Sequence, residues 1–313
     1  MVVSQPPNVE SIFEPNTGTW QYIVSDAVTN DAVVIDSVLD YEASTNAIGN
    51  ANAERLLTLI KERGYNIVAI LETHAHADHL TAARYLQQRL LRRGKPSPPI
   101  CIGKRIAQVQ HTFAIKYGVP EAEYAGAFDR LLDDDDDIRI GRLHCKVLHL
   151  PGHTPDHIGY VIGHNVFVGD SLFLPDVGSA RCDFPGGDAR TLFRSVTEKL
   201  YALPDHYRIF VGHDYPPGVN VKGDRTEPRA FATVAEQRRD NKHIRGGVNE
   251  SEFIAWRTER DATLAEPRLM HQSLQFNIRG GRLPEASEHG HRFLHLPLKV
   301  SDEVWDWGFA PQG

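Results

Sequence analysis

Cysteine and long apolar runs are both scarce in this sequence. The 313 residues include three cysteines, Cys101, Cys145 and Cys182. This number is too small, and odd, for a disulfide framework, so we expect a reducing compartment such as the cytoplasm, with an organelle matrix also compatible. No apolar run approaches the roughly 18 residues of a membrane-spanning helix, so we expect no membrane association. The N-terminal MVVSQPPNVESIF has no basic segment followed by an apolar one, which argues against a secretory signal.

An excess of positive charge is also missing. The net charge is −7, from 34 lysines and arginines and 41 aspartates and glutamates, which argues against nucleic acid as the main partner. Apolar residues make up 41% of the chain, as is usual for a globular protein with a hydrophobic core. Histidine, by contrast, is frequent, with 16 residues. The function is therefore to be sought where these histidines gather.

Apolar periodicity predicts strands and helices in alternation, which favours a layered α/β architecture. We expect strands at residues 20–24, 32–35, 66–71, 100–102, 146–150, 160–162, 166–168 and 208–211, and helices at 51–63, 80–93, 104–117, 191–203, 231–244 and 252–262. Five aspartates at 133–137 are typical of a solvated turn, because a calcium loop spaces its ligands. We expect a catalytic domain over residues 1–235 and an extension over 236–313, whose tail from Arg279 wraps the surface.

The strongest functional signal is the segment THAHADH at residues 73–79, directly after a predicted buried strand. Burying three imidazoles and a carboxylate without partners would cost several kcal/mol, so they do not all belong to the core. His74 and His76 project to the same side of an extended segment, because side chains alternate with a period of two. Asp78 and His79 then begin a helix, where a carboxylate suits the first turn. A divalent metal accounts for the whole cluster, since imidazole and carboxylate suit zinc or iron.

Three further strand ends carry a histidine or an aspartate. His153 follows one strand in the segment PGHTPDH, Asp170 ends another in GDS, and His213 follows a third in GHDY. Asp170 is a natural terminal or bridging oxygen ligand. For His157, at the end of the first of these segments, we expect a structural role or one that orients a ligand.

The order THxHxDH, then a strand-end histidine, then GD, then GH resembles the ligand pattern of the metallo-β-lactamase superfamily, over about Thr19 to Tyr215. The resemblance implies a four-layer αββα sandwich with the metal at one edge. In binuclear members, the residues that hold one metal match His74, His76 and His153, and those that hold the other match Asp78, His79 and His213, with Asp170 as the bridge.

Longer segments resemble the persulfide dioxygenases, the sulfur dioxygenases related to the ethylmalonic encephalopathy protein. These segments are ETHAHADHLTAARYL, PGHTPDHIGYV, GDSLF, GSARCDFPGGDARTLFRSV and GHDY. The resemblance implies one Fe(II) per chain, held by His74, His153 and Asp170, which leaves coordination positions open for persulfide and O₂. It implies oxidation of glutathione persulfide with O₂ and water to glutathione and sulfite. The remaining residues would orient these ligands or hold water: His76, Asp78, His79 and His213.

The resemblance also suggests substrate contacts. Arg181 matches the arginine of the family's R-x-D-F segment, and its planar fork suits a glutathione carboxylate, unless it pairs with Asp183. Tyr215 is a candidate hydrogen-bond donor to substrate, and Cys182 is expected to be a free buried thiol. Residues 241–244 read NKHI where shorter family members have an N-P-R-like segment, and the text beyond resembles a longer, mostly bacterial branch of β-lactamase-like hydrolases.

Two other functions fit the same residues. A binuclear zinc or mixed-metal hydrolase of a thioester such as S-lactoylglutathione, as in glyoxalase II, needs the same ligands, and the number of metals per chain distinguishes it. A metal-stabilised sulfur carrier or sensor would show no steady oxygen uptake. A homo-oligomer, in the simplest case a dimer, is compatible with apolar positions of the extension that pack on the same chain or on a second copy: Leu264, Leu269, Met270, Leu274 and Phe276.

Overall fold

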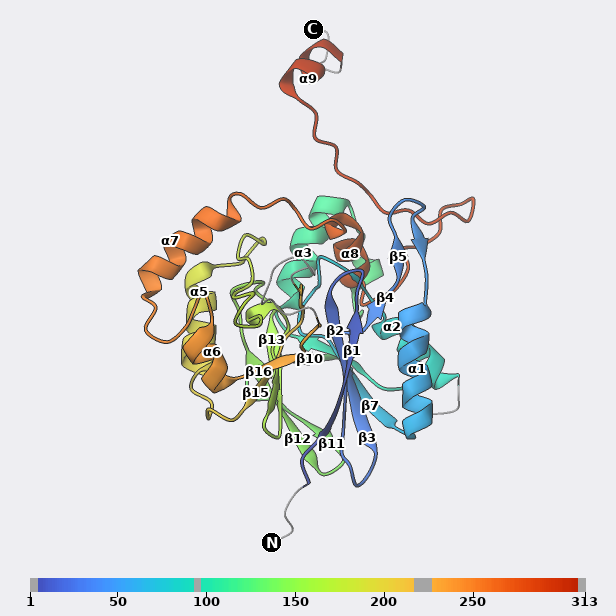
Figure 1. The fold of residues 1–313 in the computed structure, drawn as a ribbon. Coiled ribbons are helices and arrows are strands. Elements are labelled where there is room, and N and C mark those ends of the chain that lie inside the picture. The colour runs from blue at the N-terminus through green and yellow to red at the C-terminus, as the bar shows by residue number, and fades with distance from the viewer. Residues whose placement is uncertain (1–4, 93–96, 217–226, 309–313) are drawn as a thin grey trace.

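Two six-stranded β-sheets form the centre of the computed structural model, which describes residues 5–92, 97–216 and 227–308 (Figure 1). The first sheet has the order β1-β2-β3-β7-β9-β10: Asn8–Glu14, Thr19–Ser25, Asp31–Ile35, Asn66–Leu71, Ile100–Gly103 and Arg130–Leu132. The second has the order β11-β12-β13-β14-β15-β16: Asp137–Ile140, Leu143–His149, Ile158–Ile162, Asn165–Phe167, Arg208–Phe210 and Phe231–Thr233. Two short pairs complete the strands, β4 (Val38–Leu39) with β8 (Leu80–Thr81) and β5 (Tyr41–Glu42) with β6 (Ala47–Ile48).

The main core lies between the two sheets. Strand β2 is buried along its whole length, because its alternating side chains serve two interfaces. Tyr22 points into the space between the sheets, where its ring lies 5.0 Å from Phe167 and 5.5 Å from Phe210 between ring centroids. Ile23 points the other way, into the cluster beneath the helices. Burial on both faces explains why this strand is almost continuously apolar.

Helices cover the outer face of each sheet. α1 (Ala51–Arg63) and α2 (Ala83–Leu91) lie on the first sheet, and α5 (Ala189–Arg194), α6 (Val234–Asp240) and α7 (Glu250–Asp261) lie on the second (Figure 1). α3 (Ile106–Tyr117), α4 (Glu121–Tyr124) and α8 (Met270–Asn277) belong to a further group at one end. This arrangement confirms the predicted αββα sandwich.

Three predicted helices differ from the observed elements. The segment 80–93 begins as strand β8, because Leu80 and Thr81 pair with β4, and the helix starts only at Ala83. The segment 231–244 begins as strand β16, which pairs with β15, and α6 then runs only from 234 to 240 after a capping box of Thr233 and Glu236. The segment 191–203 holds α5 followed by a π-helical stretch over Ser195–Leu200. Strand β1 was not predicted at all.

The aspartate run and the cysteines follow expectation. Residues 133–136 form a turn before β11 with largely exposed carboxylates, as predicted. All three cysteines are free and buried. Across the described ranges, no helix combines the length and the apolar character needed to cross a bilayer.

Part of the segment after residue 236 packs on the same chain, whereas residues 285–306 are mostly exposed. Of the five apolar positions named above, four are buried within it: Leu269, Met270, Leu274 and Phe276. The irregular tail contacts α3 through a hydrogen bond between His295 Nδ1 and the Tyr117 carbonyl oxygen. It then leads to α9 (Asp302–Gly308), which stands apart from the body of the molecule (Figure 1).

Candidate metal centre

The predicted ligands come together at one edge of the sandwich, in the loops that follow four strands. His74, His76, Asp78 and His79 follow β7, His153 follows β12, Asp170 follows β14 and His213 follows β15. β7 runs parallel to β3 and β9, and β14 runs parallel to β15. The ends of parallel strands meet at the same edge of a sheet, which explains why residues far apart in the sequence converge here.

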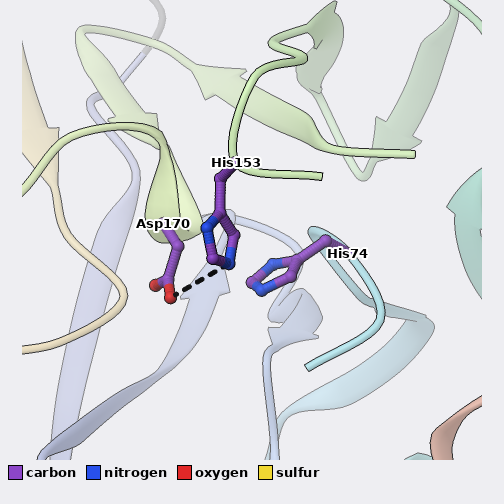
Figure 2. Close-up of side chains that lie close together, drawn as sticks. All are labelled: His74, His153 and Asp170. Atoms are coloured by element: carbon purple, nitrogen blue, oxygen red, sulfur yellow. Dashed lines mark ion pairs between the residues drawn. The ribbon is translucent and has the colours of Figure 1, made fainter. Parts of the chain in front are cut away.

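His74, His153 and Asp170 form the first cluster. One ligand atom from each lies within 4.8 Å of the others, and all three side chains point toward a common centre (Figure 2). His153 Nε2 lies 3.8 Å from Asp170 Oδ2. Two imidazoles and one carboxylate are donor types that zinc and non-haem iron sites both use.

Hydrogen bonds fix the tautomers of both histidines in this cluster. The Thr73 hydroxyl donates to Asp36 Oδ2 at 2.9 Å, so its oxygen accepts the proton of His74 Nδ1 at 2.9 Å. His153 Nδ1 lies 2.7 Å from the Arg181 carbonyl oxygen, which only accepts, so this nitrogen also carries the proton. Both Nε2 atoms therefore present a lone pair to the centre, as metal coordination requires.

A second cluster lies beside the first and contains His76, Asp78 and His79, again with ligand atoms within 4.8 Å of one another. Asp78 Oδ2 lies 3.1 Å from His79 Nδ1 and 3.3 Å from His213 Nε2. His213 Nε2 also lies 3.5 Å from Asp170 Oδ1, and this contact connects the two clusters.

One ring nitrogen of His76 contacts two buried acids, while its ring lies 4.2 Å from that of His74 between centroids. His76 Nε2 lies 3.2 Å from Asp36 Oδ1 and 3.2 Å from Glu72 Oε2. Asp36 also accepts hydrogen bonds from the backbone N–H and the hydroxyl of Thr73, and it adopts a positive φ of 51° that only a few non-glycine residues show. Sequence reasoning missed both acids. The available signal was that Asp36 follows the strand β3 directly, as the predicted ligands follow theirs.

Several buried nitrogen and oxygen atoms that could bind a metal have no hydrogen-bond partner at this edge: His74 Nε2, His76 Nδ1, His79 Nε2 and Asp170 Oδ1. Leaving so many polar atoms unpaired is costly in a folded protein, and cations bound at the two clusters would satisfy them. The backbone also makes room, because a Cβ atom on Gly212 would lie 2.5 Å from Asp170 Oδ1. The residues present therefore fit a metal site.

Electrostatics at this edge are dominated by burial and by crowding of imidazoles. Burial, reinforced by the neighbouring imidazoles of His76 and His157, holds the pKa of His74 well below its usual value, which favours the neutral form that binds metals. Burial opposes the charged form of His213, but Asp170 and Asp78 outweigh it and raise the pKa of this histidine. Burial likewise opposes ionisation of Asp78, but the imidazoles of His213 and His79 lower its pKa.

His157 supports the first cluster from behind. Its Nε2 accepts a hydrogen bond from the backbone N–H of Asp170 at 3.0 Å, and its Nδ1 lies 3.2 Å from the hydroxyl of Ser171. Its ring stacks on that of His74, with 4.6 Å between centroids and 18° between planes. The structure therefore places His157 in the supporting position that the sequence suggested.

A pocket of about 440 Å³ opens onto the first cluster. Arg181 and Tyr215 line it, together with extension residues that the sequence did not single out: Lys242, His243, Trp256, Arg257 and Arg260. Arg181 donates two hydrogen bonds of 2.6 Å to Asp183 and one of 2.8 Å to the Ala265 carbonyl oxygen, so its fork is engaged by the ion pair expected as the alternative. Tyr215 stacks on His213 and is 53% exposed.

Comparison with known proteins identifies the fold family. The family model of the metallo-beta-lactamase superfamily matches residues 17–213. The chain belongs to the metallo-β-lactamase superfamily. The structure also matches the crystal structure of ETHE1 from Myxococcus xanthus with a TM-score of 0.68 and 28% identity, over 88% of this chain and all of that one.

Relatives within the superfamily differ in their names. A probable metallo-hydrolase of Burkholderia pseudomallei is 43% identical over 93% of this chain and 98% of its own length. Glyoxylase B2 of Dictyostelium discoideum is 40% identical over 95% of this chain and 98% of its own length. The human mitochondrial persulfide dioxygenase ETHE1 is 32% identical over 88% of this chain and 89% of its own length. The chain spans only about two thirds of the length of the beta-lactamase hydrolase-like proteins of Xylella fastidiosa and Agrobacterium fabrum that it also matches.

Proposed function

We propose that this protein is a persulfide dioxygenase that oxidises glutathione persulfide with O₂ and water to glutathione and sulfite. The observation that supports this most directly is the cluster of His74, His153 and Asp170, two imidazoles and one carboxylate aimed at one point. This donor set suits one Fe(II) and leaves positions open for two further reactants. The likeness to persulfide dioxygenases in sequence and in structure supports the same function.

The contacts of His76 favour one metal over two. A binuclear site would use His76 together with His74 and His153, but among the described residues His76 shares its ligand clusters with Asp78 and His79 or with Asp36 and Glu72. Two carboxylate oxygens already contact its Nε2 at 3.2 Å. These contacts orient the His76 ring, while its Nδ1 has no hydrogen-bond partner and lies outside the first cluster of His74, His153 and Asp170.

In the proposed reaction the bound iron supplies redox chemistry and a binding site for O₂ and the persulfide sulfur. The protein side chains would hold the reacting water and limit the access of bulk solvent. Asp78 and His213 border the same pocket next to Asp170, so they are placed to hold the water molecule that the reaction consumes. Phe173, Val177 and Trp256 line the same pocket, and their apolar surface would limit access of bulk water.

The pocket also suits an anionic thiol peptide. Its rim carries Lys242 and Arg260, both exposed, and the ammonium of Lys242 forms no ion pair within the part of the chain that the structure describes. We assign these two cations, together with Tyr215 and the N–H groups that Arg181 does not use on Asp183 and Ala265, to the carboxylates and amides of glutathione. The volume of about 440 Å³ is within the range of small-molecule sites.

The alternative function is hydrolysis of a thioester such as S-lactoylglutathione by two metal ions. It is favoured by the second cluster of His76, Asp78 and His79, which offers three more ligand atoms within 4.8 Å, and by the likeness to Glyoxylase B2. Two metals about 3.5–4 Å apart would generate and position a nucleophilic water.

One paired experiment distinguishes the two functions. Protein purified without added metal is analysed for elemental content and then tested for oxygen uptake with glutathione persulfide and for hydrolysis of S-lactoylglutathione. We expect about one iron per chain and substrate-dependent oxygen uptake. About two zinc per chain, thioester hydrolysis and no oxygen uptake would instead establish the hydrolase. Metal without either activity would point to a sulfur carrier or sensor.

A further inference from the structure

The peptide group between Arg181 and Cys182 has a partner on each side. Its carbonyl oxygen, on Arg181, accepts the hydrogen bond of 2.7 Å from His153 Nδ1. Its N–H, on Cys182, donates a hydrogen bond of 2.8 Å to Asp261 Oδ2 in α7. A peptide group is planar and rigid, so the position of the carboxylate of Asp261 fixes the direction of the carbonyl that orients His153.

Asp261 is itself held in place by Arg257, one helical turn earlier on α7. Arg257 Nη2 lies 2.5 Å from Asp261 Oδ1, and the two side chains are only 4% and 5% exposed. Arg257 also donates a longer hydrogen bond of 3.4 Å to the Ser179 carbonyl oxygen and lies over the ring of Trp256. A buried ion pair is weak evidence for stability, because desolvating two charges offsets much of their attraction. The contacts of Arg257 and Asp261 with the loop at residues 178–183 suggest that this ion pair positions the loop.

Two further contacts from the extension hold the same loop. His243 Nδ1 accepts a hydrogen bond from the Ser179 backbone N–H at 3.1 Å, and its ring lies 3.9 Å from that of Trp256 between centroids. The Ala265 carbonyl oxygen accepts a hydrogen bond from Arg181 Nη1. The loop that orients His153 is therefore fixed by residues that lie beyond the match to the superfamily at 17–213.

We propose that Asp261, kept in place by Arg257, is a positioning residue that orients His153 through the peptide group 181–182. Asp261 contacts no donor atom of the metal cluster, yet its carboxylate, the peptide group and the imidazole form one chain of hydrogen bonds that ends at the metal ligand. The C-terminal extension thereby helps to position a ligand of the metal centre. This inference rests on the metal centre of the proposed function, but not on which reaction occurs there.

The test compares two double variants that differ only in the acceptor for the Cys182 N–H. Arg257→Met/Asp261→Asn keeps an amide oxygen at this position, whereas Arg257→Met/Asp261→Ala removes it. Both lack the ion pair, so neither leaves a buried unpaired charge. Each protein is loaded with Co(II), whose visible spectrum reports ligand geometry, and the rate of metal release to a chelator is measured.

We expect the alanine double variant to release Co(II) at least about tenfold faster than the asparagine one, with a changed Co(II) spectrum. If the alanine double variant is too unstable to load, Asp261→Glu replaces it in the comparison with wild type, because the longer side chain displaces the acceptor while keeping the charge.

The matched control is Glu123→Gln. This change breaks another buried ion pair between the body and the extension, that of Glu123 with Arg279 at 2.6 Å, and is expected to keep the wild-type release rate. Equal release from the two double variants, or fast release from the control, would overturn the inference. A wild-type protein that holds Co(II) at this centre but oxidises no persulfide as the iron form would overturn the proposed function alone.

Discussion

The two ligand clusters at this edge differ in what their donor atoms already contact. In the first, His74 and His153 each use one ring nitrogen to bind a neutral hydroxyl or carbonyl oxygen, and their other nitrogens carry no hydrogen. In the second, Asp78 already contacts His79 at 3.1 Å and His213 at 3.3 Å, and His76 contacts two further acids.

This difference has a consequence for metal binding. The first cluster has oriented lone pairs and lacks a cation to satisfy them, so it is organised in advance for one metal. In the second cluster His76 Nδ1 and His79 Nε2 also lack hydrogen-bond partners, but Asp78 already contacts two imidazoles of the protein, and a second metal would have to share or displace those contacts. We therefore expect the first cluster to bind a metal more tightly than the second.

The largest effect is expected from removing a ligand of the first cluster. His74→Ala, His153→Ala or Asp170→Ala should each abolish iron binding and oxygen uptake together, because two remaining ligands hold iron poorly. Iron per chain is measured beside oxygen consumption with glutathione persulfide. A full iron content in any of the three variants would show that the ligand assignment is wrong.

The second cluster is tested by Asp78→Asn, which keeps the shape of the side chain and removes its charge. We expect iron to stay near one per chain, while oxygen uptake falls about 10–100-fold because the water beside Asp170 is held less well. His157 contacts neither Asp78 nor the pocket, so its support of the first cluster should be the same in this variant as in the wild type. A fall from two metals to one would instead reveal that the second cluster binds a metal of its own.

A smaller effect is expected at Asp36, which supports both clusters. Asp36→Asn replaces an acceptor that now receives hydrogen bonds from the Thr73 N–H, the Thr73 hydroxyl and His76 Nε2. Leaving one of these buried donors unpaired should lower the free energy of unfolding by about 1–3 kcal/mol. Chemical denaturation of the metal-free protein measures this. Asp31→Asn, at the partly exposed start of the strand β3 that precedes Asp36, serves as the control and should change stability little.

Much of the metal site could be predicted from the sequence because its ligands break a local pattern. His74, His153, Asp170 and His213 each follow an apolar strand, where polar side chains are conspicuous, and the fold brings strand ends together. The helix α1 and its end could be predicted from equally local signals, since Gly64 adopts the left-handed conformation that ends the helix.

The residues that sequence reasoning missed act over long separations. Asp261 reaches Cys182 across 79 positions, and Leu80–Thr81 form a strand only because β4 lies beside them. No local period carries such information, and helical propensity predicted a helix from Leu80, whereas strand pairing delays the start of that helix to Ala83. Lys242 was likewise inconspicuous, because nothing nearby in the sequence indicates that it faces the pocket.

The smallest effect is expected at the pocket rim, where two cations can be compared. Arg181 is held by Asp183 and the Ala265 carbonyl, whereas the ammonium of Lys242 is exposed and makes no ion pair within the described residues. An exposed ion pair contributes about 0.2–1 kcal/mol, so Lys242→Ala should raise KM for glutathione persulfide about 1.5-fold to fivefold and leave kcat unchanged. Arg181→Ala should also act mainly on KM. Salt should weaken the contribution of Lys242, because screening acts on exposed charges. Lys61→Ala on α1, far from the pocket, is the control. A pure fall in kcat at either rim cation would contradict its assignment to substrate binding.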